Sequence, residues 1–251
     1  MKITIITIVK NDINHIISTI RSVLSQSYKN LEYIIIDGYS KDGTYQKIKN
    51  ELKNKQKKFN IKLFRKSDKS MYEALNNGIK HSKGEIIGLL HSGDRFYSKS
   101  TLNLVAKSFN NKNVISGNVI FKNKINKITR LWNYEVKRLT PSSSYKIAHT
   151  SLFIRRNLIK NVGNYSVKYK ISSDTDFIIR LSKNKNTKYG FLKKYLIIMS
   201  NKGLSSSYSN LMQKIYEDLN IYFYHFNFLF LFFYIKKIIY KLMQLFIWKL
   251  S

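Results

Sequence analysis

The sequence predicts an α/β fold, in which a mostly parallel sheet carries helices on both faces. Two observations point to this class. Several apolar runs, such as Ile34-Ile35-Ile36, are continuous rather than alternating, as in strands that are buried on both faces. The segments between these runs repeat apolar residues at helical spacing, and such βαβα alternation is typical of a parallel sheet.

The first half of the chain contains four strands and four helices in alternation. We predict strands over Ile3–Val9, Leu31–Asp37, Phe59–Arg65 and Ile86–Leu90. We predict helices over Asn14–Gln26, Asp42–Leu52, Ser70–His81 and Ser100–Phe109. In each helix the apolar residues gather on one face, which would pack on the sheet.

The second half is less regular. We predict strands over Val114–Lys122, Lys127–Trp132, Ile147–Ile154 and Tyr195–Met199, the first two forming a hairpin, and a helix over Ser173–Leu181. Residues 133–146 are polar and contain the one proline, so we expect a mobile loop over the site. These elements form one domain, residues 1–206, and residues 207–251 form a helical, apolar and basic tail.

The tail leaves two alternatives open. Its apolar run, Ile221–Ile235, is shorter than the roughly 20 residues that a spanning helix needs. Flanking lysines and aromatic residues favour a helix lying in the membrane surface. The alternative is a helical hairpin packed on the domain or on a second subunit, so an oligomer is possible.

Composition limits the chemistry. The chain has no cysteine, which excludes disulfides and thiolate catalysis, and its five histidines lack the spacing of a zinc motif. The net charge of +31 points to anionic partners such as phosphates or a membrane surface, although part of the lysine excess is compositional. The N-terminus lacks the features of a signal peptide and predicts a strand, so we expect a cytoplasmic protein.

Aspartates follow two of the predicted strands. Asp37 ends one strand, and Asp94 follows Ile86–Leu90 by four residues. Ligands of α/β sheets bind outside the carboxyl ends of the strands, so both carboxylates reach the rim where a ligand would lie. This arrangement suits a nucleotide-sugar with its metal ion.

Five segments together resemble the inverting glycosyltransferases of family 2, which adopt the GT-A fold. They occur in the family's order between about residues 1 and 206: Asp37-Gly38-Tyr39-Ser40-Lys41-Asp42-Gly43-Thr44, Ser67-Asp68 with Met71–Ile79, Gly84–Asp94, Ile147–Arg156 and Ser173–Leu181. Gly203-Leu204-Ser205 resembles a late family segment near the site.

The resemblance implies a nucleotide-sugar site. Asp37 would accept hydrogen bonds from the base, which an ionised carboxylate can do with a uracil imide. By the same match Asp68 lies near the base or ribose, or else caps the helix that begins at Ser70. Thr7, Asn76 and His149 are further candidates for contact with the nucleotide-sugar, His149 near the diphosphate.

The metal motif departs from the family pattern, because His91-Ser92-Gly93-Asp94 contains one carboxylate. Mn²⁺ or Mg²⁺ would be held by Asp94 and the diphosphate, with waters or His91 completing the shell. An imidazole ligand suits Mn²⁺ better than Mg²⁺. The alternative is that Asp94 is a turn residue.

Asp174 matches the general base of the family. Asp176 is a rival, but residues two apart on a helix point in different directions, so only one can be the base. The match favours Asp174, and Asp176 would pair with Arg180 as scaffold.

We therefore expect a metal-dependent inverting glycosyltransferase, peripheral on the inner face of the cell membrane. It would move a sugar from a UDP-sugar to a hydroxyl of a lipid-linked glycan, in the biosynthesis of a surface polysaccharide such as capsule or lipopolysaccharide. Two alternatives are a degenerate transferase that binds donor without turnover and a nonenzymatic nucleic-acid-binding protein. The second is disfavoured because the basic residues are spread along the chain, so no nucleic-acid partner is expected.

Overall fold

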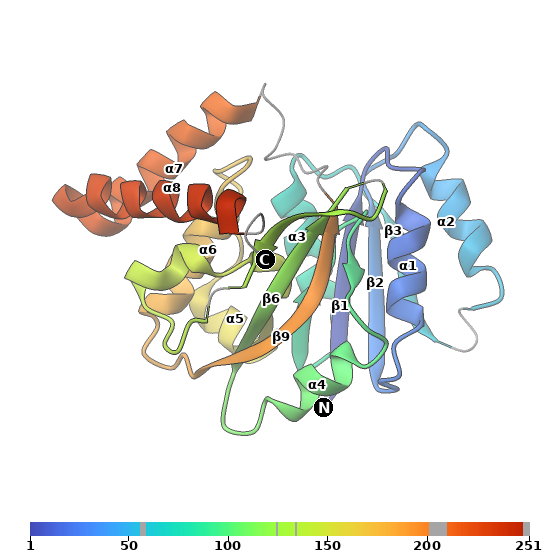
Figure 1. Ribbon diagram of the computed structural model, residues 1–251. Helices are drawn as coiled ribbons and strands as arrows, with labels where there is room; N and C mark the ends of the chain where they lie inside the picture. Colours follow the sequence, from blue (N-terminus) through green and yellow to red (C-terminus); the bar gives the residue numbers. More distant parts are fainter. Residues whose placement is uncertain (56–58, 124, 134, 201–209, 248–251) are drawn as a thin grey trace.

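The computed structural model describes residues 1–55, 59–123, 125–133, 135–200 and 210–247. These residues form a nine-stranded sheet in the order β3-β2-β1-β4-β8-β6-β9-β5, with β7 paired to β6. Figure 1 shows the sheet at the centre, with helices in front of it and behind it. The α/β class with helices on both faces is confirmed.

The first half of the sheet is parallel, as the continuous apolar runs indicate. It consists of β1 (Ile3–Val9), β2 (Leu31–Asp37), β3 (Asn60–Arg65) and β4 (Ile86–Leu89). Because β2 and β4 flank β1 in parallel, their carboxyl ends meet at one edge of the sheet. This edge carries the predicted site residues.

The second half is mixed. It contains β5 (Arg95–Phe96), β6 (Val114–Lys122), β7 (Ile128–Trp132), β8 (Phe153–Arg155) and β9 (Tyr189–Ser200). The hairpin of β6 and β7 is confirmed by their antiparallel pairing. Strand β8 runs antiparallel to both β4 and β6, whereas β6 and β9 are parallel. The reversal at β8 joins the parallel half to the rest of the sheet.

Helices cover the two faces through two separate apolar clusters. On one face lie α1 (Ile16–Leu24), α2 (Thr44–Leu52) and α4 (Thr101–Lys107). On the other lie α3 (Met71–His81), α5 (Arg156–Val162) and α6 (Ser173–Lys183). Each helix buries the face that its apolar spacing predicted, apart from α5, which periodicity missed.

Two local predictions are wrong. The expected strand Ile147–Ile154 is instead the 3₁₀ helix η2 (His149–Ser151) followed by β8. Its cause is local, since both the amide and the hydroxyl of Ser151 donate to the carbonyl of Ala148, which competes with extended pairing. In the expected loop over 133–146, Val136 and Leu139 are buried, and Pro141–Lys146 forms the 3₁₀ helix η1.

The tail forms two helices, α7 (Leu211–Phe226) and α8 (Phe230–Ile247), joined by the 3₁₀ turn η5 (Asn227–Leu229). They lie beside α6 in Figure 1, across the molecule from α1 and α2. Polar contacts fasten them there: Lys237 of α8 binds Asp218 of α7 at 2.8 Å, and His225 binds Asp176 of α6 at 2.9 Å. The hairpin packing that the sequence left as an alternative is therefore present.

Within the described residues, no helix combines the length and apolar character that a membrane crossing requires. The predicted boundary at residue 206 and the segment Gly203-Leu204-Ser205 lie outside the described residues.

Candidate active site

Asp37 ends β2 and has one carboxylate oxygen free. The side chain is completely buried, and its Oδ1 accepts a hydrogen bond from the Ser40 amide at 3.1 Å and lies 3.5 Å from Arg65 Nε. Its Oδ2 is buried and has no hydrogen-bond partner within the described residues. A buried carboxylate oxygen without a donor is costly, so this atom is suited to an N–H of a ligand.

Asp68 shows the same feature. Its Oδ1 accepts from Asn77 Nδ2 at 2.6 Å, and its buried Oδ2 has no partner within the described residues. The alternative that Asp68 caps α3 is wrong, because Ser70 is the N-cap and accepts from the Glu73 amide at 3.1 Å. Asp68 therefore keeps an acceptor available beside the end of β3.

Thr7 and Asn76 are engaged in structural hydrogen bonds. Thr7 is completely buried, and its hydroxyl donates to the Leu90 carbonyl at 2.7 Å and accepts from the Tyr33 hydroxyl at 3.0 Å. The Asn76 amide bonds both the N–H and the C=O of Tyr165. Both side chains are engaged within the protein in this arrangement, and their contact with a nucleotide-sugar stays a prediction.

The turn His91–Asp94 is held by residues that sequence reasoning missed. Gly93 has φ +91°, which favours glycine, and its amide donates to Thr19 Oγ1 at 2.9 Å. The same hydroxyl donates to the Asp94 carbonyl at 2.8 Å, and Ser92 Oγ donates to Asp12 Oδ2 at 2.6 Å. Asp12 follows the first strand, and Thr19 lies in the first helix. Their position near the carboxyl end of that strand is the only sequence feature that could have marked them as site residues.

Asp94 and His91 have the donor chemistry of a divalent-cation site. Asp94 is 4% exposed and accepts from the Ser200 amide at 3.2 Å, and burial raises its pKa to about 7. Burial, with His149 adding to it, lowers the pKa of His91 to about 3, and His91 Nδ1 has no partner within the described residues. A cation here would offset the burial of the carboxylate and use the free imidazole nitrogen.

The described residues contain no group of three or more His, Asp and Glu side chains placed to hold a metal ion. Asp94 and His91 would therefore need oxygens from the donor diphosphate or water to complete a shell, as the sequence predicts.

A chain of three polar side chains crosses the site. His91 Nε2 lies 3.1 Å from His149 Nε2, and His149 Nδ1 lies 3.0 Å from Asp174 Oδ2. The 3₁₀ helix η2 places His149 between the other two residues. The predicted metal side and the predicted base, 83 positions apart in sequence, are thus separated by one imidazole.

Asp174 lies in the first turn of α6. Its Oδ1 accepts from the Thr175 amide at 2.9 Å and lies 3.5 Å from the Tyr72 hydroxyl. Burial alone would raise its pKa, but the His149 imidazole holds the pKa of Asp174 well below its usual range. The carboxylate is therefore ionised at neutral pH.

Asp176 has a structural role. It bonds Arg180 Nε at 2.8 Å, as predicted, and His225 Nε2 at 2.9 Å. Asp176 is thus held by two cationic partners and is 8% exposed, whereas Asp174 is 24% exposed and joins the row of histidines, so Asp174 is the better candidate for proton transfer.

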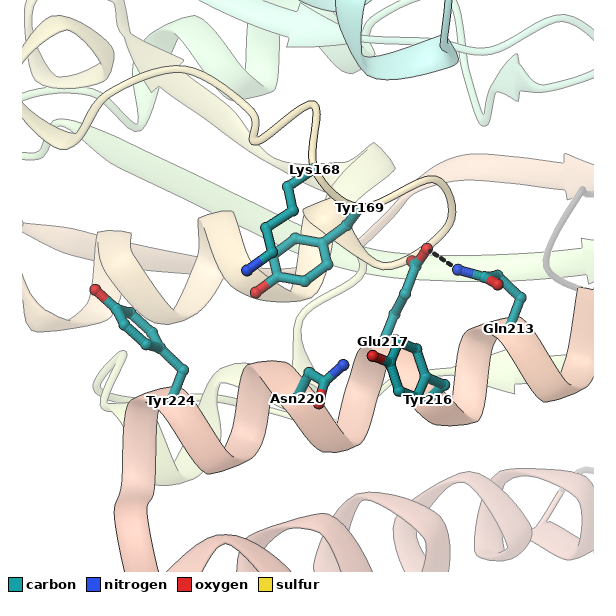
Figure 2. Close-up of a pocket in the computed structure, with 7 residues that line it drawn as sticks. All are labelled: Lys168, Tyr169, Gln213, Tyr216, Glu217, Asn220 and Tyr224. Carbon is teal, nitrogen blue, oxygen red and sulfur yellow. Dashed lines mark hydrogen bonds between the residues drawn. The ribbon is translucent and has the colours of Figure 1, made fainter.

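The tail contacts the loop that leads into α6. Glu217 of α7 is buried and accepts hydrogen bonds from the consecutive amides of Lys170, Ile171 and Ser172, at 2.8, 2.9 and 2.9 Å. Figure 2 shows Glu217 beside Gln213, whose amide donates to it at 2.8 Å. Both line a cavity of about 350 Å³ with Lys168 and three tyrosines, Tyr169, Tyr216 and Tyr224. The start of the helix that carries Asp174 is thus fixed by the tail.

Comparison with known proteins agrees with this fold and site. The profile of glycosyl transferase family 2 matches residues 4–171, about two thirds of the chain. The chain therefore belongs to glycosyl transferase family 2, and its fold is the GT-A fold.

The chain is similar to curated glycosyltransferases. An uncharacterized glycosyltransferase of Mycobacterium tuberculosis is 27% identical over 195 residues, which cover 71% of this chain and 68% of that protein. A PGL/p-HBAD biosynthesis glycosyltransferase of Mycobacterium bovis is 27% identical over 168 residues, 65% of this chain and 62% of that protein.

Two solved structures share the fold. S. aureus TarS 1-349 in complex with UDP-GlcNAc superimposes with a TM-score of 0.71 at 19% identity, covering 88% of this chain and 66% of TarS 1-349. The mannosyltransferase PcManGT from Pyrobaculum calidifontis, in complex with GDP-Man and Mn²⁺, gives 0.66 at 14% identity, covering 88% and 63%.

Proposed function

We propose that this protein is an inverting glycosyltransferase that moves one sugar from a UDP-sugar to a hydroxyl of a lipid-linked glycan in surface polysaccharide biosynthesis. The observation that carries this proposal is the row that runs from the Asp94 turn through His91 and His149 to Asp174. The free oxygen of Asp37 lies at the same edge of the sheet, because β2 and β4 both flank β1 in parallel. The edge thus provides Asp37 for the nucleobase, Asp94 and His91 for the leaving diphosphate, and Asp174 for the attacking hydroxyl. The neighbours solved with UDP-GlcNAc and with GDP-Man and Mn²⁺ support a nucleotide-sugar donor.

Each protein group has a distinct role in this reaction. Asp37 accepts the imide N–H of uracil, and Arg65 lies beside the same carboxylate. Asp174 accepts the proton of the acceptor hydroxyl while that oxygen attacks the anomeric carbon, and the bond from this carbon to the diphosphate breaks on the opposite face. Configuration inverts, and proton transfer of this kind contributes about 100- to 10,000-fold.

His149 orients the base, because its Nδ1 lies 3.0 Å from Asp174 Oδ2. Asp94 and His91 would hold a divalent cation together with the diphosphate oxygens. The site would prefer Mn²⁺ to Mg²⁺, because one of its ligands is an imidazole. When bound, the cation supplies neutralisation of the charge on the leaving diphosphate.

Thermal stability in the presence of nucleotides tests the donor site. UDP, GDP and their sugar conjugates are compared with and without Mn²⁺ on the wild type and on Asp94→Ala. A ligand that binds only the folded state raises the Tm. We expect stabilisation by the UDP compounds that depends on Mn²⁺ and is lost in Asp94→Ala. A wild type that no nucleotide stabilises would contradict the proposal.

We further propose that the tail binds an anionic membrane at the inner face of the cell membrane, where a lipid-linked acceptor lies. One face of α8 is exposed and carries large apolar side chains: Leu231, Phe232, Ile235, Ile238, Ile239, Leu242 and Met243. Exposed apolar patches of this kind mark interaction surfaces, and the charge of +31 favours an anionic one.

Vesicle sedimentation tests the membrane proposal. We expect the wild type to bind vesicles that contain phosphatidylglycerol, and to bind pure phosphatidylcholine vesicles less well. Replacing Ile235 and Ile239 by Glu should abolish binding without changing the Tm response to UDP, because both side chains point away from the domain. A different result would assign the face to a second copy of the chain. In that case light scattering would show a dimeric wild type and a monomeric double variant, and the double variant would still sediment with the vesicles.

A further inference from the structure

Three lysines of the tail gather around one carboxylate. Lys214 and Asp218 lie one turn apart on α7, and Lys237 and Lys241 lie one turn apart on α8. Asp218 is 2.8 Å from Lys237 Nζ and 4.0 Å from Lys214 Nζ. The two helices thus bring three ammonium groups to a single acidic side chain.

Two members of this cluster are withdrawn from solvent. Lys237 and Asp218 are 4% and 3% exposed. The Lys241 ammonium has neither a hydrogen bond nor an ion pair among the residues that the structure describes. Burial, reinforced by Lys237 and Lys214, holds the pKa of Lys241 well below its usual range. Lys241 itself is partly exposed, so an anion from solvent can reach its ammonium group and complete the cluster.

The nearby carboxylates are occupied elsewhere. Asp174 is paired with His149, Asp176 is paired with Arg180 and His225, and Glu217 accepts three backbone amides. Asp218 is therefore the only carboxylate within ion-pair distance of the cluster in the described part of the chain. Three lysines lie beside this one aspartate, and the ionised Asp174 also acts on Lys237 and Lys241.

The position of the cluster connects it with catalysis. Lys237 Nζ donates to Thr175 Oγ1 at 3.2 Å, so the cluster faces the first turn of α6, next to Asp174. The amino end of an 11-residue helix adds further attraction for an anion. The apolar face of α8 lies on the opposite side of the same helix.

We propose that Lys214, Lys237 and Lys241 bind a phosphate group of the acceptor, the phosphate or diphosphate that joins the glycan to its lipid. The inference rests on the proposed transfer to a lipid-linked acceptor and identifies where that acceptor is recognised. The phosphate would lie on the Asp174 side of the site, apart from the donor diphosphate at Asp94. The lipid chain would continue toward the membrane beside α8.

The experiment compares wild type, Lys241→Met and the matched control Lys236→Met by thermal unfolding in EDTA. Lys236 is the neighbouring lysine of α8 that is exposed and lies over the Phe232 ring at 4.1 Å. The probes are inorganic pyrophosphate, farnesyl diphosphate and farnesol. At ten times Kd, a ligand specific for the folded state should raise the Tm by about 3–6 °C in a chain of this size.

We expect both diphosphates, but not farnesol, to raise the Tm of wild type and of Lys236→Met, and to leave Lys241→Met unchanged. If pyrophosphate raises the Tm and farnesyl diphosphate does not, the cluster binds a free phosphate rather than a lipid-linked one. An equal response of Lys241→Met and wild type, or no response of the wild type, overturns the inference.

The outcome is separable from that of the proposed function. UDP with Mn²⁺ acts at Asp37 and Asp94, so it should stabilise Lys241→Met as much as the wild type. A protein that responds to diphosphates through Lys241 and to no nucleotide would contradict the transferase proposal alone.

Discussion

Replacing Asp94 by Asn should stabilise the ligand-free protein, and the gain should grow with pH. The Asp94 carboxyl has an ordinary pKa of 3.8 and a pKa of about 7 when buried in the folded protein. Each unit of pKa difference corresponds to about 1.4 kcal/mol, so ionised Asp94 lowers the free energy of unfolding by about 4 kcal/mol. Asn keeps an acceptor for the Ser200 amide without the charge.

The sign follows from proton binding. Between pH 3.8 and about 7 the folded protein holds a proton on Asp94 that the unfolded chain releases, so stability falls as pH rises through this window and levels above it. The advantage of Asp94→Asn is therefore about 2 kcal/mol at pH 5 and about 4 kcal/mol at pH 8. For a chain of this size these correspond to Tm increases of about 4–8 °C and 8–16 °C.

The assay is thermal unfolding in EDTA at pH 5 and pH 8, with Asp176→Asn as a control of opposite sign. Burial opposes ionisation of Asp176, but His225 and Arg180 outweigh it and lower its pKa, so its charge stabilises the fold at both pH 5 and pH 8. Asp176→Asn should therefore lose stability by about the same amount at pH 5 and pH 8, because both lie above the ordinary pKa of 3.8. If the Tm difference between Asp94→Asn and wild type does not increase with pH, the reasoning on burial is refuted.

Three further changes test other parts of the structure. Asp174→Asn should reduce sugar transfer about 100- to 10,000-fold and leave UDP affinity unchanged, and loss of UDP binding would assign Asp174 to the donor. Glu217→Gln should lower the free energy of unfolding by about 1–3 kcal/mol, because the glutamine side chain cannot accept from all three backbone N–H groups. It should also slow turnover without raising the KM for the donor, which steady-state kinetics would show. Gly78→Ala should cost about 1–3 kcal/mol in urea unfolding with no effect on UDP affinity, because its Cβ would lie 2.5 Å from Ile6 Cγ2.

The predicted site residues separate into those that local sequence could place and those that it could not. Asp37 could be placed because a continuous apolar run ends there, and strand β2 has the predicted bounds. Thr7 faces the interior of the same sheet and is bonded to Tyr33 and Leu90. Its orientation depends on β4, which comes about 80 residues later in the chain, and no local pattern reports that pairing.

The strand predicted over Ile147–Ile154 failed for a related reason. Apolar residues at Ile147, Leu152 and Ile154 are buried as expected, but they reach the core from a 3₁₀ turn and a short strand. Periodicity records which residues are buried and leaves open the backbone path between them. The path matters here, because the turn is what directs His149 toward Asp174.

The sequence by itself determined the α/β class, the parallel strands at the centre and the aspartates at their carboxyl ends, because these depend on apolar runs and helical spacing within short windows. Only the tertiary structure decided how distant groups meet. The imidazole of His149 lies between His91 and Asp174, Glu217 holds the loop before Asp174, and three lysines surround Asp218. These contacts join residues that are tens of positions apart, and the hydrogen bonds, burial and charge that define them arise when the helices and the sheet pack together.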